Sequence, residues 1–145
     1  MCYLMAYTKP DFFAAVAPLA GLTLEWMYRG LEASGPVPLL EIHGTSDKTS
    51  LWNGDPLNEG GWGAYISVPA AVGYWAAVNR CTHEETEYLP GKENGCQVVA
   101  HKYVGGTGGA EVWLYEIQGG SHSLSASDLD TGVVVLEFFS RYVEM

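Results

Sequence analysis

One stretch of the sequence constrains the fold more than any other: Leu39 to Asp47, which reads Leu-Leu-Glu-Ile-His-Gly-Thr-Ser-Asp. It is a short, largely apolar run that follows Val37-Pro38 and ends in a turn, a pattern that predicts a buried β-strand. The turn carries polar side chains to the carboxyl end of that strand. Because active sites of open α/β sheets are built at the carboxyl ends of strands, we expect Asp47 to lie at a functional edge.

A second predicted strand leads to a histidine. Glu111 to Ile117 is followed by a short loop that ends at His122. An imidazole activates a hydroxyl nucleophile by removing its proton, and a carboxylate fixes the tautomer of that imidazole. Taken singly, Asp47 and His122 are better explained as ordinary turn and loop residues. In this order, and each after a strand, they predict the acid and the base of a catalytic triad, brought side by side.

The sequence contains no nucleophile to complete such a triad. The pentapeptide Gly-x-Ser-x-Gly, which places a serine on a strand-to-helix elbow, does not occur. Among the serines, Ser46, Ser50, Ser67, Ser121, Ser123, Ser125 and Ser127 all lack this setting.

The rest of the chain alternates between predicted helices and strands. Lys48 to Gly63 has no periodicity and is expected to be a long surface loop, the kind of loop that often carries function. The expected elements are a helix end at Cys2–Thr8, a buried strand at Phe12–Leu19, a helical turn within Leu24–Leu31, a helix from the Ser67 N-cap to about Asn79, a strand at Gln97–Val104 joined by a glycine-rich hairpin to Glu111–Ile117, and a closing helix from about Thr131 with Asp128 or Asp130 as its cap. This order predicts a single α/β domain over residues 1–145, with a mostly parallel sheet, flanking helices and one antiparallel hairpin.

Composition excludes several classes of partner. Seven Lys and Arg against seventeen Asp and Glu give a net charge of −10, so nucleic acid and anionic membrane surfaces are not expected partners. No apolar run approaches the roughly 18 residues of a spanning helix. The apolar run from Phe12 to Ala20 is preceded by Asp11 and by no positive charge in the first eight residues, so we do not expect it to be a signal peptide.

The three cysteines leave two interpretations open. Cys81 and Cys96 bracket a polar loop, and in an exported protein they would form a disulfide that closes it. In a reducing compartment both would be unpaired thiols. No Cys-x-x-Cys or His-x-x-x-His spacing indicates a zinc site.

Four motifs, in this order, resemble the feruloyl esterase and polyhydroxybutyrate depolymerase group of secreted α/β-hydrolases. The resemblance covers nearly the whole chain. The motifs are Pro10-Asp11-Phe12-Phe13-Ala14-Ala15-Val16-Ala17-Pro18 with Gly21, then Ile42-His43-Gly44-Thr45-Ser46-Asp47, then Ser67-Val68-Pro69 followed by Trp75 and Asn79-Arg80-Cys81, and finally Gly119-Gly120-Ser121-His122-Ser123.

This resemblance implies the carboxy-terminal half of an α/β-hydrolase domain. It implies that Asp47 and His122 are the acid and base of a Ser-Asp-His triad, and that the serine elbow lies immediately before Met1–Tyr7, outside this chain. The isolated chain is then expected to be inactive. The implied substrates are feruloyl or acetyl esters of plant cell-wall polysaccharide or a polyester, with no cofactor and no metal. The implied location is extracellular or periplasmic. The exposed sheet edge and bare sheet face predicted for this chain favour association with a partner.

The resemblance also bears on Trp52, which falls where the group carries a substrate-facing aromatic residue. A tryptophan that packs the loop onto the core is an equally good interpretation. Two features depart from the group. Ser123-Leu124 stands where the group often has an aromatic residue and a proline. No cysteine lies at Gly105–Gly109, where the group often has one, so either Cys96 is the partner of Cys81 or the bridge is absent. The alternative functions are a non-catalytic domain that binds carbohydrate or a partner, and an inactive fragment.

Overall fold

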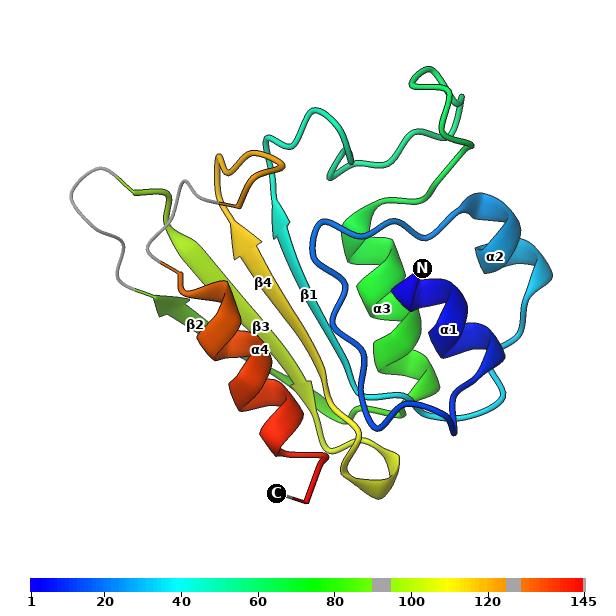
Figure 1. Cartoon of the computed structure of the whole chain (residues 1–145), viewed down its shortest axis with the longest axis vertical. Coiled ribbons are helices and arrows are strands. Elements are labelled where there is room, and N and C mark those ends of the chain that lie inside the picture. The colour runs from blue at the N-terminus through cyan, green and yellow to red at the C-terminus, as the bar shows by residue number, and fades with distance from the viewer. Residues whose placement is uncertain (90–94, 125–128, 145) are drawn as a thin grey trace.

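The computed structural model describes residues 1–89, 95–124 and 129–144. Its centre is a four-stranded sheet with the strand order β1-β4-β3-β2 (Figure 1). The strands are β1 (Leu39–Gly44), β2 (His83–Leu89), β3 (Val98–Val104) and β4 (Val112–Ile117).

The sheet is mixed, so the prediction of a mostly parallel sheet is wrong. Among the four strands named above, only β1 and β4 are parallel to each other, whereas β3 runs antiparallel to both β4 and β2. Strands that follow one another through short connections pair antiparallel, because a parallel pair needs a long crossover. The sequence did not reveal β2, which was expected to be part of a polar loop. This edge strand is exposed along nearly its whole length and therefore carries no apolar alternation.

The predicted strand at Phe12–Leu19 is present only as an irregular edge. It runs parallel to β1 through isolated bridges from Val16 to Leu39 and from Leu19 to Ile42. Its hydrogen bonds to this strand include Leu40 N–H to the Val16 carbonyl, at 3.0 Å, and Ala20 N–H to the Ile42 carbonyl, at 2.9 Å. Pro18 lacks an N–H donor, which interrupts a regular ladder.

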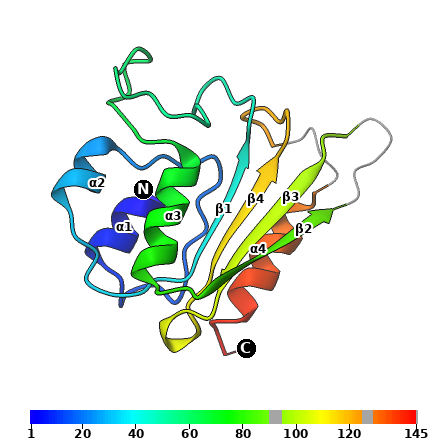
Figure 2. The same cartoon turned by 180° about the vertical axis from the view of Figure 1, so that it is seen from behind.

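The helices are α1 (Cys2–Thr8), α2 (Glu25–Gly30), α3 (Val68–Val78) and α4 (Thr131–Ser140). Residues of α1, α2 and α3 form one core cluster with the sheet, and α4 packs on the opposite face (Figures 1 and 2). The predicted caps are confirmed: Ser67 Oγ accepts from Ala70 N–H at 3.3 Å, and Asp130 accepts from Val133 N–H at 3.1 Å. Asp128, the other candidate cap, lies outside the described residues. Within the described ranges, no helix is long and apolar enough to cross a membrane.

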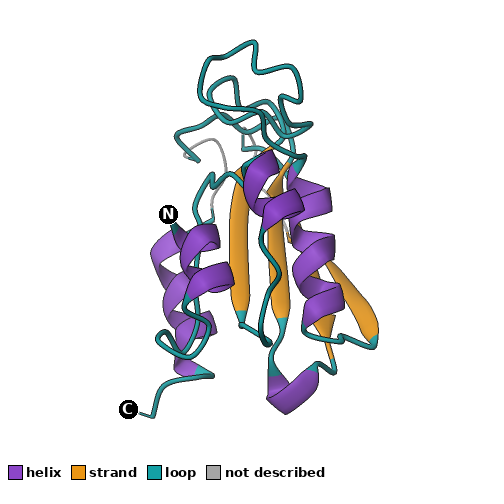
Figure 3. Cartoon of the chain, turned by 90° about the vertical axis from the view of Figure 1, so that its right-hand side faces the viewer, coloured by secondary structure: helices purple, strands orange, loops and turns teal. Residues whose placement is uncertain are grey.

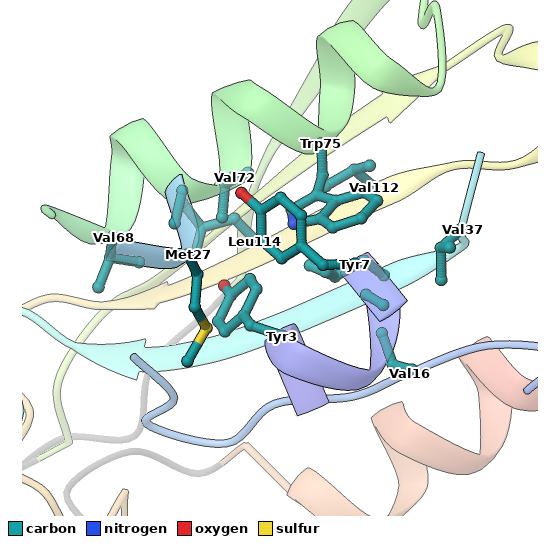
Figure 4. Packing of buried hydrophobic residues seen from close by; sticks show 13 residues of the cluster. Tyr3, Tyr7, Val16, Met27, Val37, Val68, Val72, Trp75, Val112 and Leu114 are labelled. Carbon is teal, nitrogen blue, oxygen red and sulfur yellow. The ribbon is translucent and has the colours of Figure 1, made fainter. Parts of the chain in front are cut away.

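The larger core cluster lies between the sheet and α3. Trp75 is fully buried there and contacts Tyr7 edge-on, with ring centroids 5.0 Å apart (Figure 4). Alternation along β1 places Leu39, Glu41 and His43 on this face and the intervening residues on the α4 face. An acidic residue and a histidine therefore point into the interior of the protein.

Of the two interpretations of Cys81 and Cys96, the structure has the unpaired thiols and not the disulfide. Both residues are free thiols. Cys81 lies just before β2 and Cys96 just before β3, and these strands pair antiparallel over seven residues. The two cysteines therefore lie at opposite ends of the hairpin, roughly 20 Å apart along the strands, and a disulfide needs α-carbons within about 7 Å.

Candidate active site

The loops that follow β1 and β4 meet beyond the carboxyl ends of these two parallel strands (Figures 1 and 3). There the structure brings Asp47 and His122 together, although 75 positions separate them in the sequence: His122 Nδ1 lies 2.8 Å from Asp47 Oδ2. The parallel pairing of β1 and β4 accounts for this, because the carboxyl ends of parallel strands lie at the same edge of the sheet.

Backbone contacts hold the two loops against each other. Thr45 N–H donates to the Ile117 carbonyl at 3.0 Å, and Ser46 N–H donates to the Gly120 carbonyl at 2.9 Å. Gly119 N–H donates in turn to Thr45 Oγ1 at 2.8 Å. These bonds fix the separation of the loops and thereby the geometry of the acid–histidine pair.

The Asp47 carboxylate is fully buried and has a defined partner at each oxygen. Oδ1 accepts the N–H groups of Thr49 and Ser50, both at 2.8 Å, and Oδ2 accepts from His122. Burial acts to raise the pKa of Asp47, but the hydrogen bonds from Ser50, His122 and Thr49 outweigh it and hold that pKa below its ordinary value. Asp47 is therefore an ionised acceptor near neutral pH.

The ring of His122 is half exposed, with 51% of its side-chain surface accessible. Because an ionised carboxylate only accepts, Nδ1 carries the proton of the neutral ring and Nε2 is left as the basic nitrogen. In the described part of the chain, no serine hydroxyl is hydrogen-bonded to this Nε2. The arrangement can accept a proton from a hydroxyl presented from the solvent side.

A buried polar network that the sequence analysis missed lies behind Asp47. His43 Nδ1 is 2.8 Å from Glu41 Oε1, and His43 Nε2 is 2.7 Å from the Ser50 carbonyl. The Glu41 carboxylate also accepts from Tyr3 Oη at 2.9 Å and from Gly21 N–H at 3.0 Å. An acidic residue inside an otherwise apolar strand was the available signal, since a fully buried carboxylate needs partners.

Two aromatic residues, Trp52 in the long loop and Tyr65 just after it, have different surroundings. Trp52 is half-buried, contacts His43 edge-on with ring centroids 6.0 Å apart, and lines a surface hollow of about 190 Å³. Tyr65 is buried, and its hydroxyl accepts from Leu51 N–H at 3.0 Å. Trp52 thus packs against the core and also lines the hollow.

The same hollow contains a histidine between two carboxylates. His101 Nδ1 lies 2.7 Å from Glu84 Oε1, and its Nε2 lies 2.9 Å from Glu116 Oε2. These three residues come from three neighbouring strands, and no contact joins His101 to Asp47 in the described structure.

Comparison with known proteins adds one relative. No family model matches the sequence. Over 118 residues the chain is 34% identical to feruloyl esterase B of Piromyces equi, an alignment that covers 78% of this chain and 21% of that protein. The chain therefore spans about a fifth of the length of this curated relative. The similarity is a distant one, at the level of the family, to a feruloyl esterase.

Proposed function

We propose that this chain supplies the acid and the base of a Ser-Asp-His triad in a carboxylic-ester hydrolase, with the serine provided from outside residues 1–145. The hydrogen bond of 2.8 Å between His122 Nδ1 and Asp47 Oδ2 is the observation that carries the proposal. The similarity to a feruloyl esterase supports an ester as the substrate.

In this mechanism Nε2 of His122 takes the proton of the serine hydroxyl as that oxygen attacks the ester carbonyl. Asp47 holds the ring in the required tautomer and stabilises the imidazolium that forms. The same imidazolium then protonates the departing alcohol, which leaves an acyl-enzyme for water to hydrolyse. Trp52 is the aromatic residue that we assign to substrate contact, on a feruloyl ring or a sugar.

A further strand beside the irregular edge would bring in the serine. The backbone groups of this edge point alternately toward β1 and away from it. Those of Val16 and Ala20 bond to β1, whereas in the described structure the backbone groups of Ala17 and Leu19 bond to no other segment. Next to the edge lies an apolar hollow of about 260 Å³, lined by residues of α1, by the edge itself and by Phe139 of α4. A strand added here parallel to β1 would end on the same side as Asp47 and His122.

The test is hydrolysis of p-nitrophenyl acetate and methyl ferulate by the natural polypeptide that contains residues 1–145. We expect His122→Ala and Asp47→Ala each to lower kcat by at least about 1000-fold. His83→Ala is the matched control, because His83 is an exposed histidine on β2, and it should leave kcat unchanged. Full activity in the His122→Ala protein would contradict the proposal.

Two further outcomes separate the rival functions. Residues 1–145 alone should show no turnover, and turnover by this chain would overturn the assignment of the serine to another segment. Binding of feruloylated arabinoxylan without hydrolysis by the natural polypeptide, lost on Trp52→Ala, would instead favour a non-catalytic binding domain.

A further inference from the structure

The carboxylate of Asp47 lies between two imidazoles. His122 approaches it from the solvent side at 2.8 Å, and His43 approaches from the interior, with Nε2 at 3.6 Å from Asp47 Oδ2. We propose that His43, held in place by Glu41, is a positioning residue for the Asp47–His122 pair and sets the charge that Asp47 presents to His122. This inference rests on the proposed function, because it assigns a role within that same site.

Hydrogen-bond accounting indicates the protonation state of His43. The Ser50 carbonyl can only accept, so Nε2 of His43 must carry a hydrogen. On the other side, the Tyr3 hydroxyl and Gly21 N–H donate to the Glu41 carboxylate, and His43 Nδ1 lies 2.8 Å from its Oε1. Donors to a carboxylate favour its ionised form, and an ionised Glu41 requires a hydrogen on His43 Nδ1. Glu41 and His43 then form a buried carboxylate and imidazolium.

The groups around His43 favour its protonated form. Burial acts to lower the pKa of His43, but Glu41, the Ser50 carbonyl and Asp47 outweigh it, so the pKa is raised above its ordinary value. Glu116 on β4 is the cross-strand neighbour of His43, and its carboxylate is bonded to His101. Burial raises the pKa of Glu41 above its ordinary value, and the bonds from His43, Tyr3 and Gly21 offset only part of this increase.

An imidazolium at this place changes what Asp47 does to His122. A buried carboxylate favours the protonated form of an adjacent histidine, and a cation on the other side of that carboxylate weakens this effect. The positive charge of His43 offsets part of the Asp47 charge, which weakens the attraction between Asp47 and the imidazolium form of His122. The bond from His43 Nε2 to the Ser50 carbonyl also holds the loop whose N–H groups orient Asp47.

NMR of residues 1–145 tests the inference without any catalytic assay. In the wild-type chain, ¹⁵N shifts of the His43 ring should show both nitrogens protonated at neutral pH, and an unprotonated Nδ1 or Nε2 would overturn the inference. Titration of His122 supplies the second readout. His43→Gln should raise the pKa of His122 by about half a unit, because a cation near the shared carboxylate is lost.

A double variant and a matched control keep this test decisive. Glu41→Gln with His43→Gln avoids a lone buried carboxylate, and it should shift His122 in the same direction. His101→Gln also removes an imidazole bonded to two carboxylates, but one without contact to Asp47, so it should leave the pKa of His122 unchanged. An unchanged pKa in the double variant, or an equal shift in His101→Gln, would overturn the inference.

Asp47→Asn separates failure of the inference from failure of the proposed function. It should lower the pKa of His122, because the ion pair is lost. If Asp47→Asn has no effect, the acid–base pair itself is refuted and the proposed function fails with it. If Asp47→Asn lowers the pKa but the His43 variants do not raise it, only the role of His43 is refuted.

Discussion

Gly44 determines how closely the two loops of the candidate site approach each other. It is the last residue of β1, and a β-carbon added there would overlap the carbonyl of Gly120 and lie 2.8 Å from the Ser121 carbonyl. The contact is between backbone groups on both sides, so no flexible side chain can move out of the way. A single hydrogen atom in place of a side chain thus permits the 2.8 Å bond between His122 and Asp47.

Gly44→Ala should therefore separate the loops. We expect it to destabilise the chain by about 1–3 kcal/mol, the usual cost of overpacking, and to abolish the dependence of the His122 pKa on Asp47. Urea denaturation and NMR titration measure the two effects. Gly73→Ala is the control: Gly73 is exposed in α3 with open space around it, and alanine there should stabilise the helix by about 0.5–1 kcal/mol. Equal effects of both substitutions would contradict this explanation.

At the scale of elements, Asn79 links the end of α3 to the start of β1. This fully buried side chain donates to the Val37 carbonyl at 2.8 Å and accepts from Val37 N–H at 2.9 Å. Its backbone carbonyl accepts from Thr107 N–H, in the β3–β4 connection, at 2.7 Å. One side-chain amide therefore fixes the helix relative to the strand that leads to Asp47.

Asn79→Ala should leave both polar groups of Val37 buried without partners. The expected loss is about 2–4 kcal/mol in the free energy of unfolding, since each unsatisfied buried group costs about 1–3 kcal/mol. Denaturant titration measures it, with Asn53→Ala as the control, because Asn53 is an exposed loop residue and its replacement should change stability by less than about 0.5 kcal/mol. A loss in Asn79→Ala no larger than in the control would show that the link is dispensable.

At the scale of the whole molecule, the hairpin of β2 and β3 extends the sheet away from the candidate site. The fold holds together through two core clusters and the sheet, without a covalent bridge among its cysteines. Cys81 is instead placed to donate weakly to the Tyr103 carbonyl, with Sγ and the oxygen 3.4 Å apart.

The thiols should accordingly remain free even when the chain is made in an oxidising compartment. After unfolding in guanidinium without reductant, we expect a thiol reagent to count three free cysteines per monomer, the number in the sequence. The same count after treatment with a reductant is the reference. One free thiol without reductant and three with it would mean that a disulfide forms.

The sequence by itself determined the elements and the two residues of the candidate pair. Apolar runs, N-caps and turn residues are local signals, so they located β1, β4, α3 and α4 and placed Asp47 and His122 just beyond strand ends. The functional importance of the pair was inferred from their order along the chain.

Only the tertiary structure decided how the elements combine. Strand direction and partners depend on contacts between distant residues, so a mostly parallel sheet was predicted where the structure has a mixed one. For the same reason the sequence left a Cys81–Cys96 bridge open, whereas the structure separates the two thiols. The edge strand β2 escaped prediction because solvent, not a core, covers its faces. Glu41 and His43 can lie buried next to each other only because folding gathers Tyr3, Gly21 and Ser50 around them as hydrogen-bond partners, since buried ionisable groups are tolerated only with such partners.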